Sequence, residues 1–98
     1  MLELDKVECE QFAACLNQDF EIVFTDGVLP VKLTEARPLG VRSESIREPF
    51  ALAFVADRPL RLPQGVYKIR HATLGEMEIF LVQVAADQAS STFEAVFN

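Results

Sequence analysis

The 98-residue sequence contains no tryptophan, four glycines, two cysteines and a single histidine, His71. With one histidine, a metal site would need carboxylates or thiolates brought together from distant segments. Cys9 and Cys15 would stand about 120° apart around one helix axis, so they cannot easily bridge, and neither begins a Cys-x-x-Cys motif. The glycines stand singly, as in LPQGVY and TLGEME, where they favour turns over phosphate cradles. We therefore expect no metal and no cofactor.

Long apolar runs are also missing. No run approaches the ~18 residues that a membrane-spanning helix needs. The chain begins MLELDKVECE, with acids where a signal peptide would carry basic residues. Half of the residues are nevertheless apolar, enough for one domain to bury its own core. The sequence thus predicts a single cytoplasmic domain over residues 1–98, without a membrane partner.

Positive charge is scarce at the start of the chain. The net charge is −6, and residues 1–26 hold seven acids against Lys6 alone, whereas residues 27–98 balance eight acids with eight bases. An acidic chain gains nothing from releasing counterions from a phosphate backbone, so we expect no nucleic-acid partner. A local basic patch within residues 32–70 is the less favoured alternative.

The residue types that perform catalysis form no recognisable motif. The two neighbouring carboxylates Glu76 and Glu78 share one strand face that is expected to be solvated, which does not favour an acid/base pair. His71 stands at an expected turn, where it either bonds to backbone or serves as a base. The serines fall in expected loops without a nucleophile elbow: Ser43, Ser45, Ser90 and Ser91. We expect a protein that is not an enzyme.

What the sequence does contain is periodicity. The segment LDKVECEQFAACLN predicts a short amphipathic helix with Asp5 as N-cap, Glu8 as its capping-box partner and Asn17 as its end. Phe12, Cys15 and Leu16 would share its buried face. Its outer face would carry Glu8, Glu10 and Gln11.

From Asp19 onward, apolar residues alternate with polar ones, which predicts strands. A hairpin turning at Asp26-Gly27 is expected, and Pro30 places its return strand at an edge or a bulge. A second hairpin would turn around residues 72–75, with Lys68 and Arg70 facing Glu76 and Glu78. Further strands are expected at residues 50–55 and 93–97, and residues 38–48 should form the longest and most mobile loop.

These elements predict a mainly β fold, a small antiparallel β-barrel or roll of about six strands with one short N-terminal α-helix across an open end. We expect the last strand to pair with the first hairpin and so help to close the barrel. Among the aromatic residues, only Phe80 and Phe50 are candidates for an outward position, and a core position is favoured for both. Because Val82 and Val84 make the second face of their strand apolar as well, we expect the helix to cover it.

Four segments in order, PFALAF, LPQGVY, LGEMEIFLV and EAVFN, carry a resemblance. With them the chain resembles a family of small bacterial proteins of about this length and of uncharacterised function, whose pattern is PF-x-L-x-F, LPQG-x-Y, LGE-x-x-x-FLV and EAVFN. The resemblance assigns no reaction, cofactor or catalytic residue. Members are thought to lie beside genes for phage-tail-collar-like proteins, which implies an accessory or assembly role.

Two functional hypotheses follow. The first is a non-enzymatic interaction or assembly module that binds another protein or associates with itself, as a homodimer for example, through an edge strand and the face of Phe80, Val82 and Val84. The alternative is a small β-barrel that binds a small apolar ligand between the helix and the strand ends. Its polar contacts would come from Tyr67, Arg70 and His71.

Overall fold

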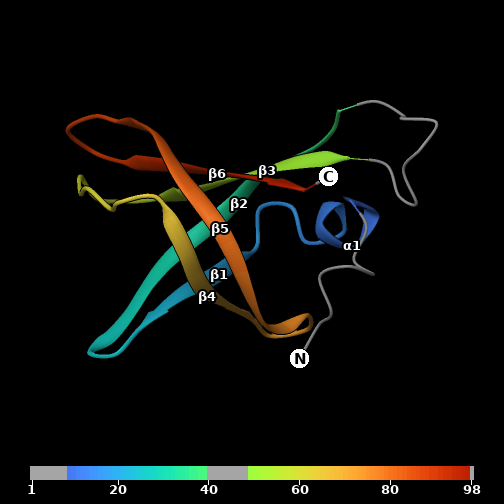
Figure 1. Ribbon diagram of the computed structural model, residues 1–98, viewed down its shortest axis with the longest axis horizontal. Coiled ribbons are helices and arrows are strands. Elements are labelled where there is room, and N and C mark those ends of the chain that lie inside the picture. The colour runs from blue at the N-terminus through green and yellow to red at the C-terminus, as the bar shows by residue number, and fades with distance from the viewer. Residues whose placement is uncertain (1–8, 40–48, 98) are drawn as a thin grey trace.

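The computed structural model describes residues 9–39 and 49–97. They form a closed antiparallel barrel of six strands with one short helix, as expected (Figure 1). The order of strands around the barrel is β1-β2-β3-β6-β5-β4. The elements are α1 (Cys9–Ala13), β1 (Asp19–Phe24), β2 (Gly27–Pro38), β3 (Phe50–Ala56), β4 (Gly65–His71), β5 (Gly75–Ala86) and β6 (Ser91–Phe97).

The first hairpin joins β1 to β2. Phe24 lies opposite Gly27, so the two loop residues are Thr25 and Asp26, one position earlier than the expected Asp26-Gly27 turn. The register still places the alternating apolar side chains of both strands inside the barrel. Those buried on the two strands are Phe20, Ile22, Leu29, Val31 and Leu33.

Pro30 lies within β2 but outside its ladder with β3. It faces Glu21 of β1, whereas the pairing of β2 with β3 begins only at Lys32. Counting from the hairpin loop, Glu21 and Pro30 form a non-hydrogen-bonded pair, so a backbone N–H at this position would point away from β1. Proline is tolerated because no ladder bond is needed there. The edge strand or bulge expected at Pro30 was wrong, because β2 has a neighbour on each side and its irregularity lies between Leu33 and Glu35.

The second hairpin joins β4 to β5 through residues 72–74, with His71 opposite Gly75, as expected. Gly75 has a φ of 83°, in the left-handed region that favours glycine. A three-residue loop followed by such a residue is a common hairpin connection.

The barrel closes differently from the expectation. The last strand, β6, lies between β3 and β5, and the closing pair is β1 with β4. The prediction that residues 93–97 pair with the first hairpin was therefore wrong. Residues 57–64 cross one end of the barrel and bring β4 beside β1, which leaves the position between β3 and β5 for the last strand (Figure 1). Since every strand has two neighbours, the expected binding edge strand is also absent from the described chain.

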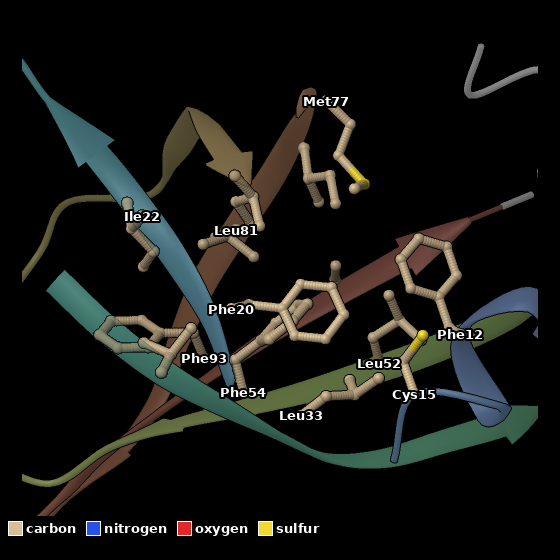
Figure 2. Packing of buried hydrophobic residues seen from close by; sticks show 14 of the residues in the cluster. Phe12, Cys15, Phe20, Ile22, Leu33, Leu52, Phe54, Met77, Leu81 and Phe93 are labelled. Carbon is tan, nitrogen blue, oxygen red and sulfur yellow. The ribbon is translucent and has the colours of Figure 1, made fainter. Parts of the chain in front are cut away.

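The helix covers one end of the core. The Phe12 ring is fully buried and lies 6.0 Å from Phe50 and 5.8 Å from Phe97, measured between ring centroids. Phe50 is thus a core residue. Figure 2 shows Phe12 and Cys15 beside the strand side chains that fill the interior, among them Phe20, Phe54 and Phe93.

Asn17 ends the helical segment with a φ of 66°, as expected. Its backbone N–H then donates to the Leu33 carbonyl at 2.7 Å, and the Leu33 N–H donates to the Gln18 carbonyl at 3.2 Å. These bonds hold the end of the segment against β2. Leu16, expected on the buried face, is instead 39% exposed, because it follows the helix in this turn.

We expected the helix to cover Phe80, Val82 and Val84. This prediction was wrong, because α1 packs against β2 and β3. The predicted N-cap Asp5, its partner Glu8 and most of the predicted loop over residues 38–48 lie outside the described residues. Within the described residues, no helix has the length and apolarity to cross a membrane.

Candidate functional site

His71, the last residue of β4, is a structural part of the second hairpin. Its Nδ1 accepts the backbone N–H groups of Thr73 and Leu74, both at 3.1 Å. Nδ1 must therefore be unprotonated, so the proton of the neutral ring is on Nε2, 2.8 Å from Gln18 Oε1. The interpretation of a turn histidine bonded to backbone is confirmed, and both ring nitrogens are hydrogen-bonded within the fold.

The surroundings of His71 favour its neutral form. The side chain is buried, with 6% of the residue exposed, and its ring lies 4.4 Å from that of Phe20. Burial lowers the pKa of His71, because the imidazolium would lose its hydration. The two N–H groups that donate to Nδ1 also favour the neutral ring, since a ring protonated at Nδ1 could not accept these hydrogen bonds.

Arg70 lies on the outside of the barrel beside an open hollow of about 600 Å³. Its guanidinium pairs with Glu21 Oε1 at 2.7 Å from Nη2 and 3.0 Å from Nε. We expected Arg70 to pair with the acids of β5, and Glu76 does lie opposite it in register. The ion pair forms across the barrel closure instead, because Glu21 lies opposite Arg70 on the other side.

Tyr67, the third expected ligand contact, lies elsewhere. Its hydroxyl donates to the Pro63 carbonyl, and its ring meets the edge of Phe24 at 6.0 Å. Tyr67 and His71 are four positions apart on one strand, a span of about 13 Å. Only Arg70 and His71 line the same hollow, so the three residues do not converge on one cavity.

Sequence reasoning missed two polar side chains, Gln83 and Ser91, that hold the crossing segment 57–64. Gln83 accepts from the Leu62 N–H at 2.9 Å and donates to the Leu60 carbonyl at 2.8 Å. Ser91 is fully buried and accepts from the Leu60 N–H at 3.0 Å. The sequence does hold a signal for Gln83: it follows the apolar residues Ile79 and Leu81 at the next inward position of β5. A polar side chain that points inward needs a hydrogen-bond partner.

The thiols and carboxylates of the described residues do not gather into a site either. Burial raises the pKa of the Cys15 thiol, which keeps it protonated and unreactive, and no disulfide joins it to Cys9. Over residues 9–39 and 49–97, no three His, Cys, Asp or Glu side chains are grouped as metal ligands.

The remaining candidate is a row of apolar side chains on the outside of β4 and β5, called here the outer face: Val66, Phe80, Val82 and Val84. Val66 and Phe80 lie opposite each other in register and are 61% and 51% exposed. Val84 is 54% exposed and lies at an irregularity of the ladder between Gln83 and Ala85. Ordinary alternation along β5 places Val84 outward, because the preceding residue, Gln83, points inward.

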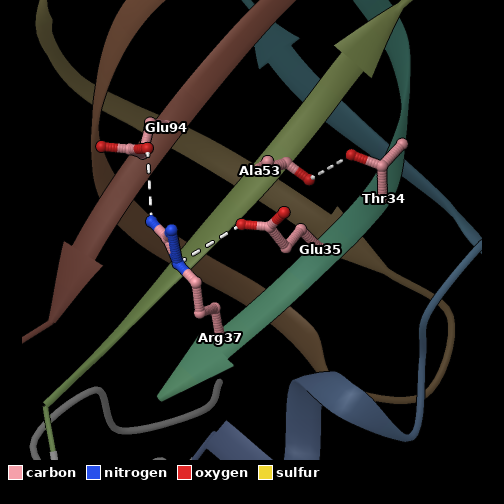
Figure 3. A network of polar contacts seen from close by, with 5 residues as sticks. All are labelled: Thr34, Glu35, Arg37, Ala53 and Glu94. Atoms are coloured by element: carbon pink, nitrogen blue, oxygen red, sulfur yellow. Dashed lines mark hydrogen bonds and ion pairs between the residues drawn. The ribbon is translucent and has the colours of Figure 1, made fainter. Parts of the chain in front are cut away.

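A polar surface bounds the outer face beyond β6. Arg37 reaches Glu35 at 3.4 Å and Glu94 at 3.8 Å, and the Thr34 hydroxyl donates to the Ala53 carbonyl at 3.3 Å (Figure 3). On the other side, Lys68 and Glu78 lie opposite each other in register. The outer face is therefore an apolar row with charged groups on both sides.

Comparison with known proteins gives one finding of similarity. The model of a domain of unknown function, DUF6916, matches residues 7–97. It agrees with the expected resemblance to an uncharacterised family and does not test the ordered sequence pattern. No curated protein and no solved structure matches the chain.

Proposed function

The chain belongs to the DUF6916 family of domains of unknown function, and from that premise we propose that it is a non-enzymatic module that binds protein through its outer face. The observation that carries the proposal is the row of exposed apolar side chains centred on Phe80. Apolar area left in water costs about 25 cal/mol per Å², so covering this row is favourable. Contiguous exposed apolar residues with a charged rim are typical of interaction sites.

The composition of the row supports the same function. Phe80 stands at its centre, with Val66 beside it and Val82 following on the same strand. An aromatic side chain surrounded by smaller apolar groups is the arrangement that most often anchors a protein interface. The strands beneath it are paired on both sides, so the surface is rigid and little ordering entropy opposes binding.

The use of the polar groups supports a non-enzymatic role. The His71 nitrogens, the Tyr67 hydroxyl and the Ser91 hydroxyl are all bonded to groups of the fold itself. These three side chains are among the types that act as general acids, bases or nucleophiles, and here they are used to hold the fold together. The small-ligand alternative has weaker support, because its three expected contacts do not share a cavity.

The assembly role extends this proposal. The resemblance in sequence implies an accessory role beside a phage-tail-like protein. A small domain with an exposed apolar face is suited to holding components together.

The test is site-specific photo-crosslinking in the source cells. A photoreactive phenylalanine analogue at position 80 should give a discrete crosslinked protein product. The matched control is the same analogue at Val28, which is 44% exposed at the tip of the first hairpin, away from the outer face. The proposal would be refuted if position 80 gave no crosslinked product, or if both positions gave the same products in the same yield.

A further inference from the structure

We infer that the outer face binds a second copy of the chain, as a symmetric dimer with Phe80 at its two-fold axis. This inference rests on the proposed function and names its partner. A two-fold interface places the same patch on both copies, so the patch must complement itself. Three properties of the outer face meet that requirement: its net charge, the arrangement of its charges and its apolar centre.

The first property is the low net charge of this side of the barrel. Copies of a chain with a charge of −6 repel each other on average. The excess lies in residues 1–26, however, and the strands beneath the outer face belong to the balanced part of the sequence. The charged residues on the outer side of β4, β5 and β6 are Lys68, Arg70, Glu76, Glu78 and Glu94.

With two positive and three negative groups, this side has a net charge of −1. Two copies can therefore approach each other here against little repulsion. Approach through the helix and β1, which hold Glu10, Asp19 and Glu21, would bring like charges together.

The second property is the position of opposite charges about Phe80. Lys68 lies opposite Glu78, two residues before Phe80 along β5, and Glu94 lies opposite Val82, two residues after it. Lys68 and Glu94 flank β5 on opposite sides. With ~3.4 Å per residue and ~4.8 Å between strands, each lies about 8 Å from Phe80, in opposite directions.

Lys68, Phe80 and Glu94 thus lie close to one line across the sheet. A two-fold axis that passes through Phe80, parallel to the sheet and at right angles to that line, exchanges the positions of the two charges. It brings Lys68 of each copy opposite Glu94 of the other. Glu94 has a contact with Arg37 at 3.8 Å within its own copy, and its side chain is 39% exposed, so it can reach a second cation.

The third property is the apolar centre. The same axis stacks Phe80 of one copy on Phe80 of the other and places Val66 near Val82. Sheets packed face to face in this way bury side chains from both inner surfaces over a layer about 10 Å thick. The apolar row thus forms the centre of the dimer, and the Lys68–Glu94 pairs form its rim.

The experiment is sedimentation equilibrium of the purified chain and of four variants, with circular dichroism to verify folding. The wild type should dimerise, and Phe80→Glu should weaken association by about 30-fold or more. Lys68→Glu and Glu94→Lys should each weaken it by about ten-fold at low salt, because each turns two attractions into repulsions. Lys32→Glu, an exposed charge reversal on β2 away from this side, should leave association unchanged.

Mixing the Lys68→Glu and Glu94→Lys variants gives the decisive measurement. In a one-to-one mixture, the carboxylate introduced at position 68 of the first variant meets the ammonium introduced at position 94 of the second. At the other contact, the unchanged Lys68 of the second variant meets the unchanged Glu94 of the first. The heterodimer should therefore associate more tightly than either variant does with itself.

A monomeric wild type, or a mixture that stays monomeric, would overturn the inference. If the wild type is monomeric but position 80 crosslinks to a different protein, the inference fails and the proposed function stands. If neither occurs, both fail.

Discussion

The use of the single histidine shows how a residue that suggests chemistry can be structural. His71 receives two backbone N–H groups from its own hairpin loop and donates to Gln18, so it joins the β4–β5 loop to the start of β1. No other side chain type offers an acceptor and a donor on opposite sides of one small ring. The bonds of His71 thus give it a structural role in joining the two segments.

His71 should make stability depend on pH. Burial lowers its pKa in the folded state below the ordinary 6.5, so the unfolded chain binds the proton more readily. The stabilisation should be complete above about pH 6.5 and should be lost as the pH falls through the folded-state pKa. Urea unfolding of the wild type between about pH 8 and about pH 5 measures the effect.

The control for this prediction is His71→Asn, which keeps a side-chain acceptor for the loop N–H groups but cannot titrate. Its stability should change less than that of the wild type over the same range. His71→Ala, which leaves both N–H groups without that acceptor, should cost about 1–3 kcal/mol at about pH 8. Equal pH profiles for the wild type and the asparagine variant would contradict the assignment.

At the scale of elements, glycine and polar side chains determine where the chain turns and crosses. Gly75 supplies a left-handed residue at the end of the second hairpin loop. Gln83 and Ser91 bind the backbone of segment 57–64, which has no strand partner. Gly75 thus shapes the turn from β4 to β5, and the two polar side chains hold the segment that connects β3 to β4.

Substitution of Gly75 by alanine should destabilise the protein by about 1–2 kcal/mol, because the cost comes from the positive φ. Space is not the cause, since a Cβ at Gly75 would meet nothing within 4 Å. Gly65→Ala is the matched control: its Cβ also meets nothing within 4 Å, and no positive φ occurs there. Chemical denaturation should show a loss for the first variant only, and equal losses would contradict the conformational explanation.

At the scale of the whole molecule, a closed barrel leaves little freedom in what can face outward. Each strand buries alternate residues, and α1 closes one end through Phe12. The outer face obeys this alternation but carries apolar residues at outward positions, where polar residues are usual. It is therefore the feature of the whole molecule that most requires a functional explanation.

Removal of the Phe12 ring should destabilise the whole barrel. Phe12→Ala deletes a fully buried ring that contacts Phe50 and Phe97, and we expect a loss of about 3–5 kcal/mol. Leu16→Ala, at a 39% exposed position just after the same helix, should cost less than about 1 kcal/mol. Thermal unfolding of both variants tests this, and a small effect of Phe12→Ala would mean that the helix does not stabilise the barrel.

The sequence by itself determined the type and approximate limits of the elements. Side chains on a strand alternate between two faces whatever their neighbours are, so the residues from Phe20 to Phe97 revealed their strands and most of the core. The turn glycine Gly75 and the helix end at Asn17 were visible for the same reason, since they depend on the local backbone. The sequence marked Phe80 only as a candidate for an outward position and favoured the core for it, so its exposure was decided by the structure.

Only the tertiary structure decided which strands are neighbours and which polar groups meet. The pairing of β1 with β4, the ion pair of Arg70 with Glu21 and the bond from Gln18 to His71 all join residues about 50 positions apart. No local pattern encodes such contacts, because they depend on how segment 57–64 crosses the barrel. For the same reason the position of α1, and hence the exposure of the outer face, followed from packing and not from the periodicity of the chain.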